Sequence, residues 1–301
     1  DEAHHTHDEE NEWSKTIRRL RQALCCSSRA GRTGVHGAIQ LDVSATPRYS
    51  KGALFTWTVF DYPLKQAILD NIVKRPLKGV ATGIKEVPSD IASVRYQTYL
   101  TAGVERWREY RDQLAPLKRK PVLFIMMNST RAADDVADYL RNKYPAEFAA
   151  DKLLVIHTDR KGEVSKRDID KARQASREID SGASPINAIV SVLMLREGWD
   201  VQSVTVVVGL RPYTSKANIL PEQTIGRGLR LMFRGRPGGP TFRERVDVIG
   251  NKAFIGFVEQ LERDEDIEFE TVDLDRDRVV IAKIFPVPEK RAYDIALPVL
   301  S

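Results

Sequence analysis

The chain has 301 residues, of which 42% are hydrophobic and 30% are charged, a composition typical of soluble globular proteins rather than disordered or fibrous ones. This length accommodates two domains with separate cores. The sequence contains no run of about 18 apolar residues, and its start is acidic and histidine-rich, unlike a signal peptide. We therefore expect no membrane partner.

Charge is distributed unevenly along the chain. The 47 basic and 42 acidic residues give a net charge of +5, which weakly favours a polyanionic partner. Residues 227–245 contain six arginines and one acid, whereas residues 259–278 contain ten acids and three basic residues, so a basic face should be followed by an acidic one. Cys25 and Cys26 are adjacent, and a disulfide between neighbours would be strained. We expect reduced thiols and a cytoplasmic protein.

Two carboxylates, Asp1 and Glu2, open the chain and are followed by His4. Beside a nucleotide phosphate, one carboxylate can hold Mg²⁺ through its water shell, and the next can orient and deprotonate the attacking water. His4, His5 and His7 also suggest a zinc site, although no distant His/Cys cluster completes a tetrahedral set. Nucleotide chemistry is the prediction, and a zinc hydrolase is the alternative.

The segment up to residue 118 is predicted less clearly. Residues 13–24 have a helical pattern, and the alternating residues 38–43 predict a strand. This strand ends at Ser44, Ala45 and Thr46, where α/β proteins place functional groups, although these hydroxyls can also simply cap a turn. Residues 61–118 are interpreted as a link between two lobes plus a helical insertion. Its helix is predicted at 91–114, with Tyr99, Trp107 and Tyr110 in the core rather than stacked on bases.

From Pro121 the pattern becomes regular. A continuous apolar run predicts a strand buried on both faces at 122–127. A second buried strand is predicted at 153–156, and two more strands at 186–192 and 204–208. Asn128, Ser129 and Thr130 can cap a helix after the first of these strands. The alternation of strands and helices predicts a parallel sheet with crossover helices.

Two arginines that follow Gln223 suggest a phosphate-binding site. Arg227 and Arg230 lie three apart, so on a helix they share one face with Gln223 one turn earlier. Two arginines preceded by a glycine suit the terminal phosphates of a nucleotide, although a solvated basic helix face is the alternative. Gly198 permits close approach of the backbone, and Asp200 can accept a hydrogen bond from a ribose hydroxyl.

Four of these segments, taken in order, resemble motifs of superfamily 2 DEAD/DEAH-box helicases. They are Asp1-Glu2-Ala3-His4, Ser44-Ala45-Thr46, Arg196-Glu197-Gly198-Trp199-Asp200 and Gln223-Thr224-Ile225-Gly226-Arg227-Gly228-Leu229-Arg230. The form Glu-Gly-Trp-Asp followed by Ile-Gly-Arg-Gly-Leu-Arg looks most like the Res subunit of type III restriction enzymes and its relatives. The resemblance spans residues 1–250.

The resemblance implies an α/β fold of RecA-like parallel sheets with crossover helices. Residues 1–60 would be the C-terminal part of lobe 1, with motifs II and III. Residues 61–118 would be the linker and insertion, 119–250 a complete lobe 2 with motifs IV to VI, and 251–301 a C-terminal extension.

The resemblance also implies a role for each matching residue. Glu2, Arg227 and Arg230 would be catalytic. Asp1, His4, Gly198, Asp200 and Gln223 would bind ATP, with Asp1 holding Mg²⁺ through water. Ser44, Ala45 and Thr46 would couple nucleotide state to strand separation, and Asn128, Ser129, Thr130 and His157 would contact the nucleic-acid backbone.

The implied activity is that of an ATP-dependent DNA helicase or translocase acting on duplex DNA, with a modification or nuclease subunit as a further partner. None of the 18 glycines is followed by lysine, so the phosphate-binding loop Gly-x-x-x-x-Gly-Lys-Ser/Thr is expected upstream of Asp1. The chain is therefore interpreted as a fragment that is inactive alone. Residues 259–301 contain no convincing nuclease set. A nucleic-acid-binding module that does not hydrolyse nucleotide, and an RNA helicase, are the alternatives.

Overall fold

The computed structural model describes residues 12, 15–20, 43, 58–80, 86–149, 151–157, 174, 177–180, 184–192, 201–210, 226–233, 243–264 and 266–273. The chain divides into two compact units, residues 1–62 and 63–301. In the first unit, residues 15–20 are helical, within the helix predicted at 13–24, and Lys15 forms an ion pair with Glu12 at 2.9 Å.

The second unit is built on one sheet. Its described residues form seven strands in the order β3-β4-β2-β5-β6-β1-β7, and every pair of neighbours is parallel. The strands are β1 (Arg75–Val80), β2 (Val122–Met126), β3 (Leu153–Ile156), β4 (Ala188–Ser191), β5 (Val204–Gly209), β6 (Arg245–Gly250) and β7 (Glu270–Asp273). The helices are α2 (Leu64–Leu69), α3 (Ala92–Arg95), α4 (Gln97–Leu114), the 3-10 helix η2 (Ala115–Leu117), α5 (Thr130–Lys143), α6 (Pro145–Phe148) and α9 (Lys252–Asp264). The predicted α/β class with a parallel sheet is confirmed.

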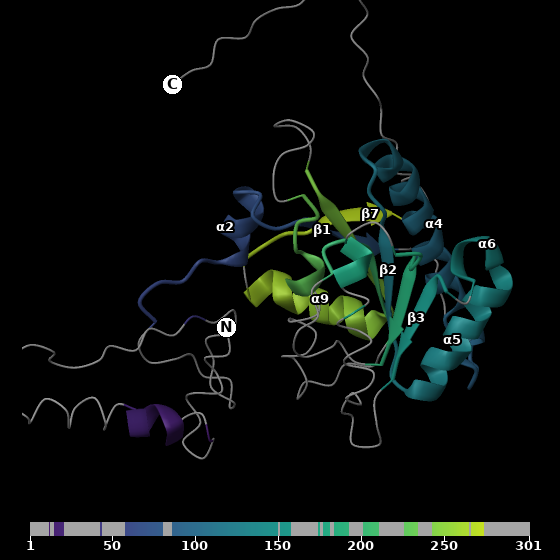
Figure 1. Ribbon diagram of the computed structural model, residues 1–301, viewed down its shortest axis with the longest axis horizontal. Coiled ribbons are helices and arrows are strands. Elements are labelled where there is room, and N and C mark those ends of the chain that lie inside the picture. Colours follow the sequence, from purple (N-terminus) through teal and green to yellow (C-terminus); the bar gives the residue numbers. More distant parts are fainter. Residues whose placement is uncertain are drawn as a thin grey trace, which may run out of the picture. The chain divides into compact units, whose positions relative to one another are not determined.

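The strands are apolar on both faces because helices cover both (Figure 1). Every residue of β2, β4 and β5 is buried, as expected for the centre of a parallel sheet. Alternate residues of a strand enter different cores: Leu123 and Ile125 pack with α4 and α5, whereas Val122 and Phe124 pack with α9. One apolar run of β2 thus serves two layers of helices.

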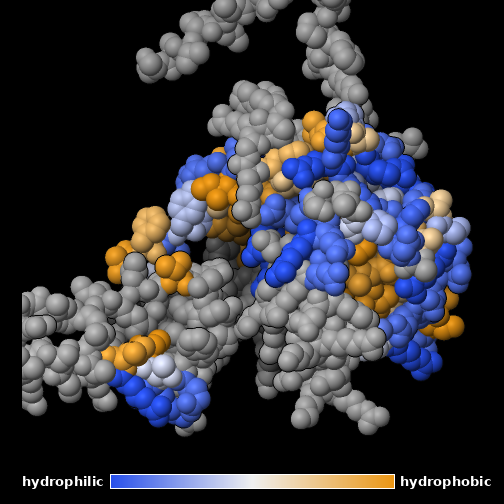
Figure 2. Space-filling model, viewed as in Figure 1, coloured by the Kyte–Doolittle hydropathy of each residue, from blue (hydrophilic) through white to orange (hydrophobic). Residues whose placement is uncertain are grey.

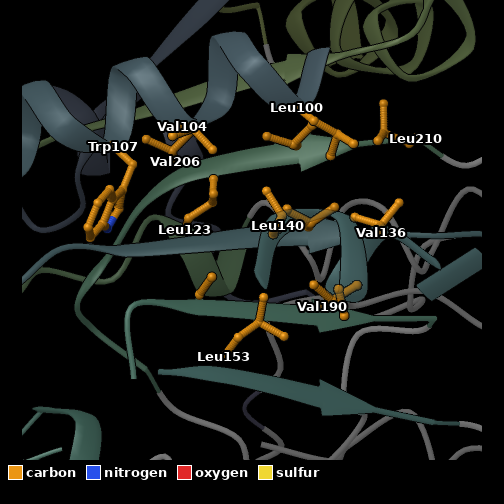
Figure 3. Close-up of a cluster of buried hydrophobic side chains, with 14 of the residues drawn as sticks. Leu100, Val104, Trp107, Leu123, Val136, Leu140, Leu153, Val190, Val206 and Leu210 are labelled. Carbon is orange, nitrogen blue, oxygen red and sulfur yellow. The ribbon is translucent and has the colours of Figure 1, made fainter. Parts of the chain in front are cut away.

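Helix α4 supplies much of the first core, as Figure 3 shows. Leu100, Val104 and Trp107 point from α4 toward Leu123 of β2 and Val206 of β5, and all five are buried. The three aromatic side chains predicted to be core residues in this helix are buried, with exposed fractions of 9% for Tyr99, 1% for Trp107 and 6% for Tyr110.

Strand β1 differs from the sequence interpretation, which placed only a link and a helical insertion in residues 61–118. It pairs with β6 on one side and β7 on the other. Pro76 and Gly79 obscure the strand pattern, because both residue types disfavour central strands. Pro76 is accommodated because the pairing with β7 begins only at Leu77. Residues 75–80 are therefore part of the same sheet, and residues 92–114 belong to its helical cover.

The segment after residue 250 also differs from the expected extension. Phe254, Phe257, Val258 and Leu261 of α9 are buried in the second core, and β7 pairs with β1. Residues 252–263, whose pattern predicts a helix, form α9 as expected, and β7 is an outer strand of the same sheet. Residues 252–273 thus complete the sheet unit.

A buried polar group connects α4 to β6. Arg106 Nε donates to Asp247 Oδ2, Tyr110 Oη donates to Asp247 Oδ1 at 2.7 Å, and Arg106 also bonds Glu109 at 2.9 Å. Asp247 is 1% and Arg106 4% exposed. Burial raises the pKa of the Asp247 carboxyl, although Arg106 opposes this shift.

Gly250→Ala is expected to destabilise the sheet unit. A methyl group at Gly250 would lie 2.4 Å from Phe254 Cδ1 and 2.6 Å from the carbonyl oxygen of Gly209, and overpacking of this kind costs about 1–3 kcal/mol. Gly256→Ala on α9 is the control, because its added carbon meets no described atom within 4 Å other than its chain neighbours and the backbone of its own helix. Urea unfolding should show a lower midpoint for Gly250→Ala only, and equal midpoints would contradict the packing argument.

Candidate functional site

Four neighbouring strands are each followed in the sequence by a predicted site segment. In the order β3-β4-β2-β5, β3 is followed by His157 and β2 by Met127 and Asn128. Strand β4 leads into the segment 193–200, and β5 leads into 211–225. Because the strands are parallel, these four connections leave from the same edge of the sheet, where such folds bind ligands.

The turn after β2 has the geometry predicted for a helix cap. Ser129 is the N-cap of α5, and its Oγ accepts a hydrogen bond from Ala132 N at 3.2 Å. Asn128 and Ser129 are exposed and Thr130 is half-buried. The first turn of a helix carries partial positive charge and favours anions. The exposed Asn128 and Ser129 thus lie beside a helix end that favours a phosphate.

Two charged residues at this turn were missed by the sequence analysis. Arg131 is exposed on the first turn of α5, and its side chain makes no hydrogen bond or ion pair with the described part of the chain. Asp134 Oδ1 lies 2.7 Å from His157 Nε2, and both side chains are solvent-accessible. A helix pattern reveals Arg131 only once the helix is known to start at the sheet edge. The Asp134–His157 pair has no sequence signal at all, because it joins separate elements.

Arg227 and Arg230 do not share a continuous helix face. Gly226, Arg227 and Gly228 are helical, but the chain turns at Leu229, and Arg230 forms an antiparallel bridge with Val73. The Arg230 amide donates to the Arg227 carbonyl at 3.3 Å. Both arginines are half-buried. The helix thus ends before Arg230.

Packing against the sheet explains this early end of the helix. Leu229 is 1% exposed in the second core, and its carbonyl accepts the Lys74 amide at 2.6 Å. Further along, the amides of Met232 and Phe233 donate to the two carboxylate oxygens of Glu244 at 2.6 and 2.9 Å. Residues 229–233, the clamp segment, therefore lie against the starts of β1 and β6.

Lys74, one residue before β1, is buried beside the clamp segment. Its side chain is 1% exposed, and Nζ donates to the carbonyls of Gln202 and Val204, each at 2.5 Å. Burial lowers the pKa of Lys74 to about 8, while the Glu244 and Asp180 carboxylates act in the opposite direction. Sequence reasoning missed Lys74, because nothing in the local pattern distinguishes it from an exposed lysine.

The other predicted site residues lie outside the described residues. They are Asp1, Glu2, His4, Ser44, Ala45, Thr46, Gly198, Asp200 and Gln223, so their roles, with Mg²⁺ at Asp1, stay predictions. His5 and His7 of the zinc alternative lie there too. Within the described ranges, no group of three or more His, Cys, Asp or Glu residues could hold a metal ion.

The described helices include none long and apolar enough to cross a membrane. On the face shown in Figure 2, the hydrophobic residues of the described part form separate patches among hydrophilic ones.

Comparison with known proteins gives likeness to solved structures only. No family model matches the chain, and no curated protein matches it. The C-terminal domain of S. cerevisiae Dbp5 bound to Gle1 and IP6 is 15% identical with a TM-score of 0.37, over 68% of this chain and 91% of that one.

Two further structures resemble the chain at a similar level. A fragment assigned to an HsdR subunit of a type I restriction enzyme from Vibrio vulnificus YJ016 is 18% identical with a TM-score of 0.45, over 74% of this chain and 41% of that one. Domain 2 of the DEAD-box helicase Mss116p, bound to an RNA duplex, is 13% identical with a TM-score of 0.36, over 66% of this chain and 64% of that one. The chain thus spans less than half of the HsdR fragment.

Proposed function

We propose that the chain belongs to an ATP-driven motor of helicase superfamily 2, of the type III restriction Res-like class, acting on duplex DNA. One observation carries this proposal. The adjacent strands β3, β4 and β2 end at one sheet edge, where His157 follows β3, residues 128–130 follow β2, and the chain leaves β4 toward the segment 196–200. A structural protein has no need to gather these polar motifs at one edge.

The proposed chemistry is ATP hydrolysis between two lobes. Glu2 orients and deprotonates the attacking water, and Asp1 holds Mg²⁺ through its water shell. Arg227 and Arg230 stabilise charge on the transferring phosphoryl group. ATP and Mg²⁺ are thus the proposed cofactors. The proposed DNA contacts are to the backbone and independent of base sequence, through Asn128, Ser129, Thr130 and His157.

The second candidate is a nucleic-acid-binding module that does not hydrolyse nucleotide. The exposed Arg131 beside the helix cap favours binding by itself, without any catalytic step. The presence of Glu2, Arg227 and Arg230 together favours the motor, because a binding module does not require them. DNA is preferred to RNA on the Glu-Gly-Trp-Asp resemblance alone.

Binding of the 301-residue chain to duplex DNA is expected to weaken steeply with salt and to ignore base sequence. Each phosphate contact contributes about 0.9 to the slope of log K against log salt. Arg131→Ala should therefore lower that slope by about one contact. Fluorescence anisotropy over a salt series, with two unrelated duplexes and a matched RNA duplex, measures both properties.

Arg263→Ala is the matched control for this measurement. Arg263 is also exposed on a helix, but it lies in the last turn of α9 within the acidic region. Its removal changes the net charge equally and should leave the slope unchanged. An affinity that is independent of salt, or equal slopes for the two variants, would count against the sheet edge as a nucleic-acid site.

A further inference from the structure

We propose that Lys74 is a positioning residue that fixes the clamp segment, and with it Arg230, against the start of β5. The inference rests on the proposed function of Arg230. Three connections meet at this residue. The Lys74 amide donates to Leu229 O at 2.6 Å, its neighbour Val73 bridges Arg230, and its ammonium reaches the carbonyls of Gln202 and Val204.

The turn at Gln202 and Ser203, which the Lys74 ammonium contacts before β5, is itself held by hydrogen bonds. The carboxylate of Asp180 accepts the amides of Gln202 and Ser203, at 2.9 and 3.0 Å, and the Ser203 hydroxyl at 2.7 Å. Lys74 thus donates to a turn whose own amides are already fixed. Gln202 lies only two residues after Asp200, the proposed ribose contact. Lys74 therefore links Gln202 to Leu229, through its side chain at one end and its main-chain amide at the other.

A buried lysine is energetically unfavourable at this position if its side chain only fills space. Removing an ammonium from water is costly unless its protons are bonded, and the lowered pKa of Lys74, about 8, reflects this desolvation. The other deeply buried charges, Arg106 and Asp247, contact each other directly. Lys74 instead contacts two main-chain carbonyls, with Glu244 and Asp180 acting on it electrostatically. Bonds to main chain fix backbone position, which is what an arginine near a phosphate requires.

The test is hydrogen exchange by mass spectrometry on the 301-residue chain with Lys74→Met. Methionine keeps the length of the stem and removes the ammonium. Exchange should accelerate by at least about tenfold, the effect of one hydrogen bond from a charged donor, in peptides covering 226–233 and 201–204. Lys78→Met is the matched control. Lys78 lies on the same strand, and its ion pair with Glu262 at 2.8 Å is also largely buried, but that pair faces α9.

Local acceleration with Lys74→Met and none there with Lys78→Met supports the inference. Unchanged exchange at 226–233, or the same uniform acceleration in both variants, overturns it. If Lys74→Met does not fold, Lys74→Gln, which keeps one amide donor, takes its place, and the same two outcomes decide.

A kinetic measurement separates positioning from stability. In a preparation of the protein that hydrolyses ATP, Lys74→Met should lower kcat by about 10- to 100-fold, the effect of a displacement of about 1 Å in a catalytic group. KM for ATP and DNA affinity should be unchanged. An unchanged kcat overturns the inference. If Arg230→Lys is fully active while the local exchange effect persists, the proposed chemistry of Arg230 fails and the positioning contact stands.

Discussion

Arg230→Lys is expected to reduce ATP turnover by about 10³- to 10⁵-fold in a preparation that hydrolyses ATP, the range found for arginine fingers. Charge develops on the transferring phosphoryl group, and lysine keeps the positive charge but loses the planar fork that bonds two oxygens. The loss should appear in kcat rather than in ATP affinity, because the contact strengthens in the transition state. Steady-state ATPase assays and nucleotide titration measure the two quantities.

Arg243→Lys provides the control for this substitution. Arg243 is exposed one residue before Glu244, which binds the clamp segment, so the same chemical change is made nearby without touching a predicted catalytic group. DNA affinity should survive both substitutions. Near-normal ATPase activity with a collapse of DNA affinity in Arg230→Lys would mean that Arg230 belongs to a nucleic-acid-binding surface.

Asp247→Ala is expected to destabilise the sheet unit by about 3–5 kcal/mol, the cost of breaking a buried ion pair from one side. The substitution leaves the buried Arg106 guanidinium without its main counter-ion and the Tyr110 hydroxyl without its acceptor. Denaturant unfolding followed by tryptophan fluorescence measures the loss, since Trp107 lies on the same helix.

The double variant Arg106→Met/Asp247→Leu serves as the comparison. Replacing both charges with apolar side chains removes the desolvation cost along with the attraction, so it should cost less than Asp247→Ala alone. If Asp247→Ala were as stable as the wild type, solvent would have to reach Asp247, which would contradict its exposed fraction of 1%.

Local patterns predict the centre of the sheet well and its outer part poorly. Strand β2 is a continuous apolar run because both faces are covered, and that is visible in sequence. Strand β1 contains Pro76 and Gly79, which local rules assign to loops. The position of β1 is determined by its pairing with two strands. The pairing with β6 begins with Arg75 opposite Arg245, and the pairing with β7 begins with Leu77 opposite Glu270. Such long-range pairing has no local signature.

The candidate site shows the same division. The cap at Ser129 is predicted by its position between a strand and an amphipathic helix, and it is confirmed in the structure. The three-residue spacing of Arg227 and Arg230 suggests one helix face, but contact of Leu229 with Lys74 ends the helix first. Lys74 itself is separated from Gln202 and Leu229 by more than a hundred residues of sequence. Only tertiary packing brings them together.

The position of β1 between β6 and β7 has a consequence for synthesis on the ribosome. β1 is the first strand of the sheet to emerge, yet both of its partners are translated near the end of the described residues. Until residues 245–250 and 270–273 have left the ribosome, β1 has no neighbour, and the nascent sheet β3-β4-β2-β5 has an unpaired edge at β5. Unpaired edges recruit other chains, and long-range parallel pairing forms slowly. The β5 edge of the nascent sheet therefore stays unpaired until β6 has been synthesised.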